Sequence, residues 1–531
     1  MLRLSGRALI VIEVTVLVAL VAYFVYYEVN YALGINDYIS DECWYVSAAR
    51  NILRKVFNLT PPYRGTYVRV TIEFTTPPNS DEYHRWVEEA KQYIEDVLRG
   101  KVVKDDSYYT YDENGNYLPA ICADIPKDKL DLIHNITHLK QYAIGYCYPN
   151  ANGILDYLNL EHPPLVKYVI GLAMLIGGDW PIVWRVPSIA LSAVILVLVY
   201  IVIKRILKDD STSGLLGLAA VAALAFDITF RSLGMVAMLD IYVAFFTYLT
   251  YVMLLMRKLD SMGATLGLGF SCKFNGAFPA IPILYEEFRR REPYIVLMTV
   301  IVMPAAIFLA LSLPLIFYLG LGSWWENSVA GAIKWHLSIK TTGGPPQAPP
   351  WYWFFGINAF PLHLVYNQAT GKWVADLIAK GNPPLYVLTL ALSIYVLPVF
   401  RKMKDGGITY VYTWLTYLMY IVIWVLGSKT QYSFYMVQIV PLLYTLLFLE
   451  IHYVLTPLSN FIDVGREWLK LLRKIGRWLR GELRVRICVE EVTKSPKENL
   501  SACEDASKSS VSINDSKRCC NNEKTLIEDT M

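Results

Sequence analysis

Long apolar stretches recur along this 531-residue chain, and they constrain its fold more than any other feature. A helix needs about 20 apolar residues to cross a bilayer. Only 18% of the residues are charged, whereas a soluble domain averages about 25%. The sequence therefore predicts an all-α, polytopic integral membrane protein. The predicted spans cover residues 8–30, 186–203, 213–230, 240–256, 262–285, 294–319, 383–400, 408–426 and 434–453.

One of these stretches, 262–285, is interrupted by polar and helix-breaking residues. They are Lys273, Asn275, Gly276 and Pro279. We expect two short segments there that meet at an outer turn, which brings the total to about ten spans. Lys and Arg gather at one set of span ends, as at 204–208 and 401–404. The positive-inside rule then places both termini inside and the two longest loops outside.

This topology divides the chain into six parts. They are an N-terminal anchor (1–30), a first outer loop (31–184), a block of core spans (185–319), a second outer loop (320–381), C-terminal spans (382–453) and a cytoplasmic tail (454–531). The tail opens with the basic amphipathic "REWLKLLRKIGRWLRGEL", which suits an anionic inner leaflet. Past about residue 490 it has too little apolar content to fold.

The first outer loop carries signals of its own. "TYVRVTIEF" alternates like a strand and "SDEYHRWVEEAKQYIEDVLRG" has helical spacing, so we expect a small α/β insertion. "HPPLVKYVIGLAMLIGG" predicts a helix in the membrane interface. In an extracytoplasmic loop Cys122 and Cys147 could form a disulfide, although spacing alone leaves the connectivity open. The sequons at Asn58 and Asn135 lie in the same loop.

Charged side chains from distant parts of the chain share the predicted outer membrane face. Ionisable groups near apolar spans are costly and are usually functional. The set comprises Asp41, Glu42, His162, Arg185, Arg231, Asp240, Lys273, His336 and Lys429. Neighbours on a helix point about 100° apart, so one acid of the Asp41–Glu42 pair can face a site while the other orients it.

Each member of the set also has a plain structural reading. The acid pair would be stabilised at a helix N-terminus by the helix dipole. Arg231 and Asp240 could pair across a short outer turn, and Lys273 could extend to the interface. Trp351 and Trp353, in "PPWYWFF", could form an interfacial aromatic belt or stack on a sugar or an acceptor.

The order of motifs resembles the protein O-mannosyltransferase family of GT-C type membrane glycosyltransferases. An acid pair opens the first outer loop, and it is followed by "HPPL", "WRVPS", "AMLDIYVAFF", "LGLGFSCKFNG", "PPWYWFF", "GNPPLY" and "SFYMVQIVP". The resemblance runs from about residue 38 to 450. It implies a GT-C-like fold and inverting transfer of mannose from a polyprenyl (dolichyl-type) phosphate to Ser or Thr hydroxyls on the outer face.

The resemblance also implies roles for individual residues. Asp41 matches the catalytic acid and Glu42 its neighbour, while Arg231 and Asp240 match the family's "R…MLD" turn. With Lys273, His162, Arg185 and Lys429, these would face the donor phosphate and sugar. His336, Trp351 and Trp353 would face the acceptor. The family needs no obligatory metal or other cofactor, and its partners are the lipid-linked sugar, an acceptor protein, the bilayer and in some members a second subunit. Nucleic acid is not expected.

Three other functions remain open. A glycosyltransferase with a lipid or glycan acceptor would share the early motifs. A transporter would also place charges on broken helices, but usually with internal repeats and midplane charges. An oligosaccharyltransferase subunit is suggested only by "SWWENS", and the chain has no clear DxD motif.

Overall fold

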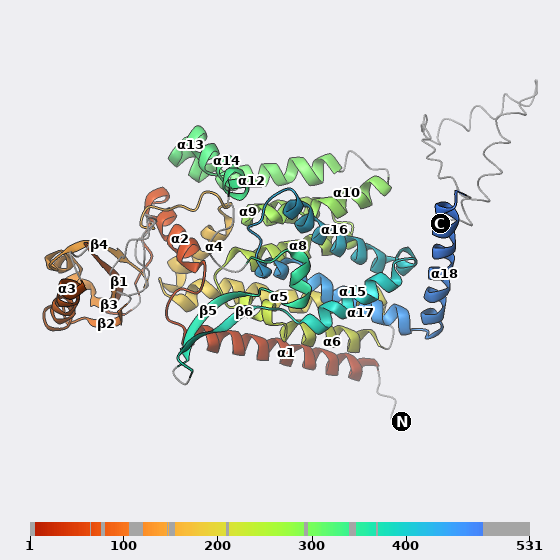
Figure 1. Ribbon diagram of the computed structural model, residues 1–531, viewed down its shortest axis with the longest axis horizontal. Helices are drawn as coiled ribbons and strands as arrows, with labels where there is room; N and C mark the ends of the chain where they lie inside the picture. The colour runs from red at the N-terminus through yellow and green to blue at the C-terminus, as the bar shows by residue number, and fades with distance from the viewer. Residues whose placement is uncertain are drawn as a thin grey trace, which may run out of the picture. The chain divides into compact units, whose positions relative to one another are not determined.

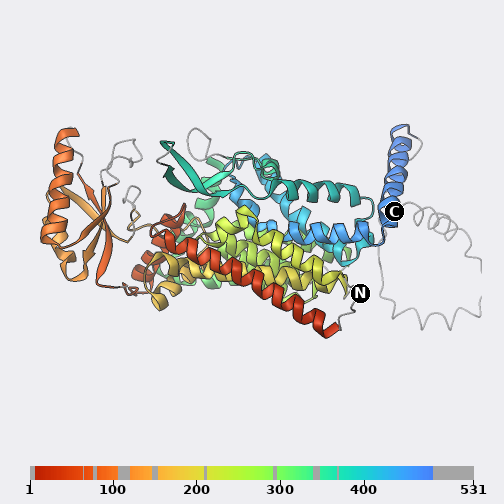
Figure 2. The ribbon, with the colours of Figure 1, turned by 90° about the horizontal axis from the view of Figure 1, so that it is seen from below.

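The computed structural model is mostly helical (Figures 1 and 2). It describes residues 6–63, 65–75, 80–105, 120–145, 147, 154–208, 212–290, 296–338, 347–367 and 370–481. Residues 1–469 form one compact unit, and residues 470–531 form a second.

Four helical segments are long and apolar enough to cross a membrane. They are α1 (Gly6–Gly34), α5 (Pro181–Leu207), α16 (Asp405–Val425), and Leu297–Leu319, which includes α12 (Met303–Leu319). Each coincides with a predicted span. The chain therefore has the helices of an integral membrane protein.

The predicted count of ten spans is not confirmed. The described residues hold four such helices, or up to six if the broken pairs α6 (Ser213–Ala225) with α7 (Ile228–Gly234) and α17 (Val440–Leu455) with α18 (Ser459–Leu479) each count as one. Other predicted spans form shorter apolar helices, namely α8 (Leu239–Leu255) and α15 (Pro383–Val396). The apolar α4 (Leu165–Gly177) lies where an interfacial helix was expected.

The predicted break within 262–285 is present. The chain leaves α9 (Leu259–Cys272) at Lys273, whose backbone is extended, passes through a short 3-10 helix, and enters α10 (Ala280–Arg289). Gly276 packs so closely on α9 that an added Cβ would lie 2.0 Å from the Gly269 carbonyl oxygen. The break therefore needs a glycine at this point.

The bend between α6 and α7 is held by a buried carboxylate. Asp227 caps α7 by accepting from the Phe230 N–H at 2.8 Å. It also accepts from the hydroxyls of Tyr386 at 2.7 Å and Tyr444 at 2.9 Å, which belong to α15 and α17. Three helices distant in sequence thus meet at one side chain.

In the first outer loop, four antiparallel strands form a sheet in the order β2-β3-β1-β4. They are β1 (Tyr67–Phe74), β2 (Lys101–Asp105), β3 (Ala120–Pro126) and β4 (Leu139–Ile144), with α3 (Ser80–Gln92) beside them (Figure 1). A separate buried cluster, which includes Val70, Ile72, Val87, Ile94 and Ile121, explains why this loop folds.

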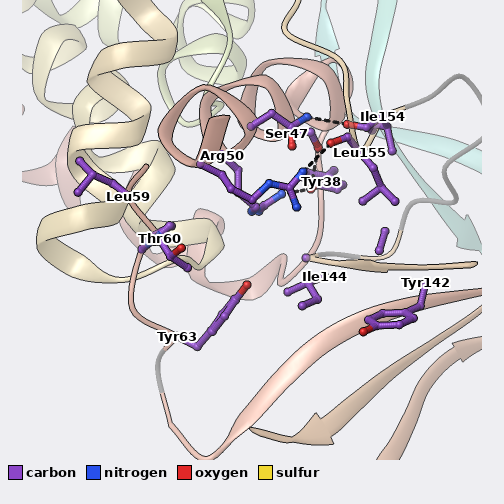
Figure 3. A pocket seen from close by; sticks show the side chains of 15 residues that line it. Tyr38, Ser47, Arg50, Leu59, Thr60, Tyr63, Tyr142, Ile144, Ile154 and Leu155 are labelled. Carbon is purple, nitrogen blue, oxygen red and sulfur yellow. Dashed lines mark hydrogen bonds between the residues drawn. The ribbon is translucent and has the colours of Figure 1, made fainter. Parts of the chain in front are cut away.

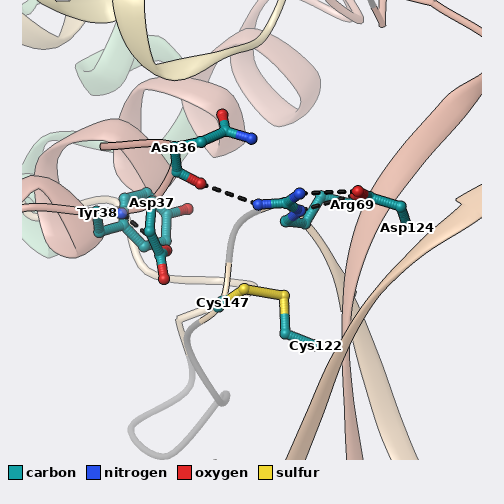
Figure 4. Close-up of a disulfide and its surroundings, with 7 residues drawn as sticks. All are labelled: Asn36, Asp37, Tyr38, Arg69, Cys122, Asp124 and Cys147. Atoms are coloured by element: carbon teal, nitrogen blue, oxygen red, sulfur yellow. Dashed lines mark hydrogen bonds and ion pairs between the residues drawn. A yellow bond between two sulfur atoms is a disulfide. The ribbon is translucent and has the colours of Figure 1, made fainter. Parts of the chain in front are cut away.

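The disulfide between Cys122 and Cys147 is present, with the Cα atoms 5.2 Å apart (Figure 4). It joins β3 to the chain that returns from β4. Asn58 and Asn135 are both exposed on this loop.

Residues 320–381, predicted to form the second outer loop, contain two short helices and a hairpin. The helices are α13 (Leu321–Asn327) and α14 (Val329–Ser338), and the hairpin pairs β5 (Phe360–Asn367) with β6 (Lys372–Ala379). Asp376 accepts from the Tyr31 hydroxyl at 2.5 Å and lies 2.8 Å from His363 Nδ1, so the hairpin is tied to α1.

The predicted amphipathic helix is present as α18, with Leu469, Leu472 and Trp478 among its exposed apolar residues. The predicted disordered tail past residue 490 lies outside the described residues.

The disulfide should stabilise the insertion. It closes a loop with a sequence separation of 25, and the loop-entropy model assigns about 3 kcal/mol to a bridge of this size. We expect a Cys122→Ser/Cys147→Ser variant to show much faster amide hydrogen exchange in β1, β3 and β4. Cys488→Ser, in the tail, serves as the control. Equal protection in both variants would contradict this expectation.

Candidate active site

A buried ion pair stands at the start of α2 (Glu42–Val56), where the sequence places its acid pair. Arg185 donates to Glu42 from Nε at 2.9 Å and from Nη2 at 2.7 Å, and both side chains are fully buried. Glu42 also accepts from the backbone N–H groups of Ile39 and Ala237, each at 2.8 Å. The carboxylate therefore binds four donors.

The remaining donors of Arg185 bind the end of α1 and the chain that follows it. Nη1 donates to the carbonyls of Ala32 at 3.0 Å and Ile35 at 2.7 Å, and Nη2 donates to that of Asp37 at 2.5 Å. A guanidinium has five N–H donors, and all five are thus directed at protein acceptors. Arg185 was predicted to face the donor phosphate, but here it is paired with Glu42.

Asp41, by contrast, faces other charged groups. It precedes the first turn of α2 and accepts a hydrogen bond from the side chain of Tyr45. Burial raises the pKa of Asp41 to about 6, the cation of Lys273 opposes this rise, and the charge of Asp240 adds to it. Asp41 lies outside the spanning helices. Since its pKa is near neutral, its carboxyl group can exchange a proton close to physiological pH.

Lys273 and Asp240, predicted separately as site residues, form an ion pair. Lys273 Nζ lies 2.9 Å from Asp240 Oδ1, and both side chains are buried. The ammonium also lies 4.1 Å from the centre of the Tyr435 ring, at cation–π distance. The second carboxylate oxygen of Asp240 is buried with no hydrogen-bond partner among the described residues. An incoming hydroxyl or other hydrogen-bond donor could bind to this oxygen, because an ionised carboxylate accepts hydrogen bonds.

His162 lies between α2 and the cluster of Lys273, Asp240 and Tyr435. Its ring packs edge-on against Tyr45, with centroids 5.8 Å apart, and its carbonyl accepts from Lys167 Nζ at 2.7 Å. Asp41, Tyr45, His162 and Lys273 thus form one connected neighbourhood.

A cavity of about 350 Å³ opens beside this neighbourhood. Its polar end is formed by His162, Lys273 and Asn275. The other walls are largely apolar and include Phe274, Phe278, Ile333, Ile423 and Leu426. A ligand with a charged head and a hydrocarbon chain would match this lining.

Two predicted donor-site cations lie elsewhere in the structure. The Arg231 guanidinium stacks 3.6 Å from the centre of the Tyr27 ring on α1. Lys429 donates to the Trp424 carbonyl at 2.7 Å, next to the cavity residues Ser428 and Thr430. Neither makes a described contact with Asp41 or Lys273.

The predicted acceptor residues also separate. Trp353 is buried and donates to the Ala348 carbonyl at 2.9 Å, whereas Trp351 is 44% exposed. Trp353 therefore packs in the core, and only Trp351 is free to meet a sugar or peptide. His336 belongs to α14, but its side chain lies outside the described residues.

Several cavity residues, among them Asn275, Tyr420 and Tyr435, were not predicted as site residues from the sequence. Asn275 donates to the Tyr420 hydroxyl at 2.7 Å and to Gln438 Oε1 at 3.2 Å. Tyr435 covers Lys273, as described above. The interruption "CKFNG" and the polar "SFYMVQ" were visible signals, but they do not show that these segments meet. Among the described residues, no three His, Cys, Asp or Glu side chains gather as metal ligands.

Comparison with known proteins agrees with the resemblance seen in the motifs. Residues 161–319 match the family model described as dolichyl-phosphate-mannose-protein mannosyltransferase. No curated protein matches the sequence.

Two solved structures are also similar to this chain. ArnT from Cupriavidus metallidurans in the apo state is 11% identical, with a TM-score of 0.37 over 55% of this chain and 49% of that chain. The same protein bound to undecaprenyl phosphate is 12% identical, with a TM-score of 0.36 over 59% and 53% of the two chains. The match therefore spans about half of the length of ArnT.

The two acids should respond differently to loss of charge. Glu42→Gln leaves the buried Arg185 guanidinium without its counter-ion, which typically costs about 3–5 kcal/mol. We expect strongly reduced thermal stability in detergent for Glu42→Gln. Asp41→Asn should melt near wild type, and so should Glu88→Gln, which removes an exposed charge on α3. Equal melting temperatures for Glu42→Gln and wild type would show that the pair does not hold the site.

Proposed function

We propose that this protein is an inverting membrane glycosyltransferase that transfers mannose from a polyprenyl phosphate to Ser or Thr hydroxyls of proteins at the outer membrane face. The observation that carries the proposal is the cavity described above. Lys273 is part of its otherwise largely apolar lining, and the charge of Lys273 acts on Asp41, whose pKa is about 6. The family match to residues 161–319 gives independent support.

The donor would bind with its phosphate at the polar end of the cavity. Lys273 supplies the positive charge, and the walls around Phe278, Ile423 and Leu426 cover the first part of the isoprenoid chain. Asp240 holds the ammonium in place at 2.9 Å. Such a fixed cation stabilises the charge that develops on a departing phosphate without having to reorganise.

Asp41 would act as the general base. The acceptor hydroxyl oxygen bonds to the anomeric carbon, and its proton passes to the Asp41 carboxylate. The bond from that carbon to the phosphate oxygen breaks, and polyprenyl phosphate leaves with the electron pair. A single displacement inverts the anomeric centre, as in inverting glycosidases, where the base also lies opposite the leaving group.

Glu42 would contribute by positioning Asp41 and would not touch the substrate. Its four hydrogen bonds fix the first turn of α2, and hence the direction of the neighbouring carboxylate. A base must lie within hydrogen-bond reach of the proton that it removes. The Glu42–Arg185 pair would supply that precision from a place where substrate does not reach.

The direct test is transfer of radiolabelled mannose from polyprenyl phosphate mannose to a Ser/Thr peptide by purified protein. We expect Asp41→Asn to lower turnover by about 10²–10⁴-fold, the usual contribution of general-base catalysis. Binding of the donor lipid should persist, because Lys273 remains. Glu88→Gln should transfer at the wild-type rate. Label that enters a lipid fraction instead of the peptide would assign the acceptor to a different class, and wild-type turnover by Asp41→Asn would remove Asp41 from the mechanism.

The pH dependence should report the same carboxylate. Asp41 must be ionised to accept a proton, and its pKa is about 6. We therefore expect kcat/KM to fall about tenfold per unit as pH drops below about 6, and to level off above it. The acidic limb should disappear from the residual activity of Asp41→Asn. An unchanged limb in that variant would assign it to another group.

A further inference from the structure

A second cavity, distinct from the one beside Lys273, borders α2 and has a volume of about 340 Å³. Five segments line it (Figure 3): Tyr38, the face of α2 that carries Arg50 and Arg54, residues 59–63, the end of β4, and residues 154–155. The insertion and the helix that carries the candidate base therefore share one cavity.

The cavity meets β4 at its edge. Tyr142, Ala143, Ile144 and Gly145 all line it, although consecutive side chains of a strand point to opposite faces. Because Tyr142 and Ala143 point to opposite faces of β4, a cavity that both residues line borders the backbone between them. The exposed feature is thus a strand edge.

Among the described strands, none pairs with the outer edge of β4. In the sheet order β2-β3-β1-β4, the neighbour of β4 is β1. The N–H of Gly145 donates to the Arg69 carbonyl on the β1 side at 2.8 Å. Because antiparallel pairing alternates along a strand, the backbone groups of Tyr142 and Ile144 face the other way, toward the cavity.

The charges around the cavity favour an acidic ligand. Arg50 is neutralised by Asp179, which accepts from it at 2.5 and 3.0 Å. Arg54 and Lys55 have a single carboxylate, Asp156, near both of them. One positive charge therefore remains at the α2 side.

A second hollow of about 200 Å³ shares the lining residues Tyr63 and Gly145 with this cavity. It is bordered by Trp180, by β1 and by the Arg69–Asp124 ion pair, which is drawn in Figure 4. The groove, as we call the two hollows together, has aromatic rings and cationic side chains in its walls, and its first part borders the edge strand β4.

We propose that this groove binds the acceptor polypeptide, which adds to β4 as an extra strand and places an acidic side chain at Arg54. An exposed strand edge recognises an extended peptide through main-chain hydrogen bonds, and the flanking pockets select side chains. The proposal rests on the proposed function for the choice of acceptor, whereas binding itself can be measured without transfer.

Because α2 borders both the candidate base and the groove, its length predicts how far the acceptor residue lies from the bound segment of the peptide. Arg54 lies thirteen residues along the chain from Asp41, which is about 20 Å at the rise of an α-helix. An extended chain covers about 3.3 Å per residue. The Ser or Thr that receives the sugar should therefore lie about six residues from the acidic residue held at Arg54.

The test uses fluorescent peptides with an acidic, strand-forming segment and a benzophenone group, added to the purified full-length protein. We expect saturable binding and crosslinks to residues 142–145 and to α2. Arg54→Gln should weaken binding about tenfold, the typical effect of losing a charge-assisted hydrogen bond. Lys101→Gln, a matched change on the opposite edge strand β2, should not weaken it.

A second variant tests the strand edge itself. Tyr142→Pro removes an N–H that points away from β1, so the sheet should tolerate it as an edge position while peptide binding falls at least tenfold. An unchanged melting temperature and intact Cys122–Cys147 disulfide would show that the insertion is folded.

The outcomes separate the two proposals. Peptides that bind and crosslink in the groove but receive no mannose would leave the groove intact and count against the protein acceptor. Transfer that is unaffected in both Arg54→Gln and Tyr142→Pro would overturn the groove. Crosslinks confined to other segments would also overturn it. The same holds if no peptide binds because a segment of the chain itself covers the edge. Among peptides that differ only in the position of Ser, the best substrate should have it about six residues from the acidic residue.

Discussion

The candidate site depends on one ion pair that has been removed from water. Moving a guanidinium and a carboxylate into a protein interior costs more than their attraction returns unless every donor and acceptor is satisfied. Arg185 and Glu42 meet that condition, because the end of α1, the turn before α2 and the chain before α8 supply the missing partners. These three segments and α5, which carries Arg185, therefore cannot shift independently, and together they fix the position of the first turn of α2.

The helix α2 then relates two different environments. At its first turn, Asp41 lies near Lys273 and a largely apolar cavity suited to a lipid phosphate. Farther along, the face of α2 that carries Arg50 and Arg54 borders the cavity that also touches β4. A transferase that joins a membrane lipid to a water-soluble acceptor needs both environments at a fixed separation. A single rigid helix supplies that separation without any moving part.

The hydropathy of the sequence was enough to locate the longest spans. The polar and helix-breaking residues after Cys272 were enough to locate the break in 262–285. Both signals are local, so one sequence is sufficient to read them. Other features depend on which distant segments meet. Nothing in the pattern indicated that Arg185 would be fully paired with Glu42 while Lys273 lines a cavity, since all the cations share one predicted depth. The hairpin β5–β6 was missed because its strands alternate weakly. The count of ten spans is not confirmed, because several predicted spans form apolar helices of 17 residues or fewer among the described residues.

The segment from Asp227 to Asp240 illustrates how this architecture limits change. Asp227 anchors its start through two tyrosine hydroxyls, the N–H of Ala237 binds Glu42, and Asp240 holds Lys273 at its end. The length of the segment is therefore fixed by three carboxylates, those of Asp227, Glu42 and Asp240. Adding or deleting one residue would rotate the following helix by about 100° and would release at least one of these attachments. The outer loops can vary in length. In the segment from Asp227 to Asp240, by contrast, only the side chains that face away from the three carboxylate contacts can vary.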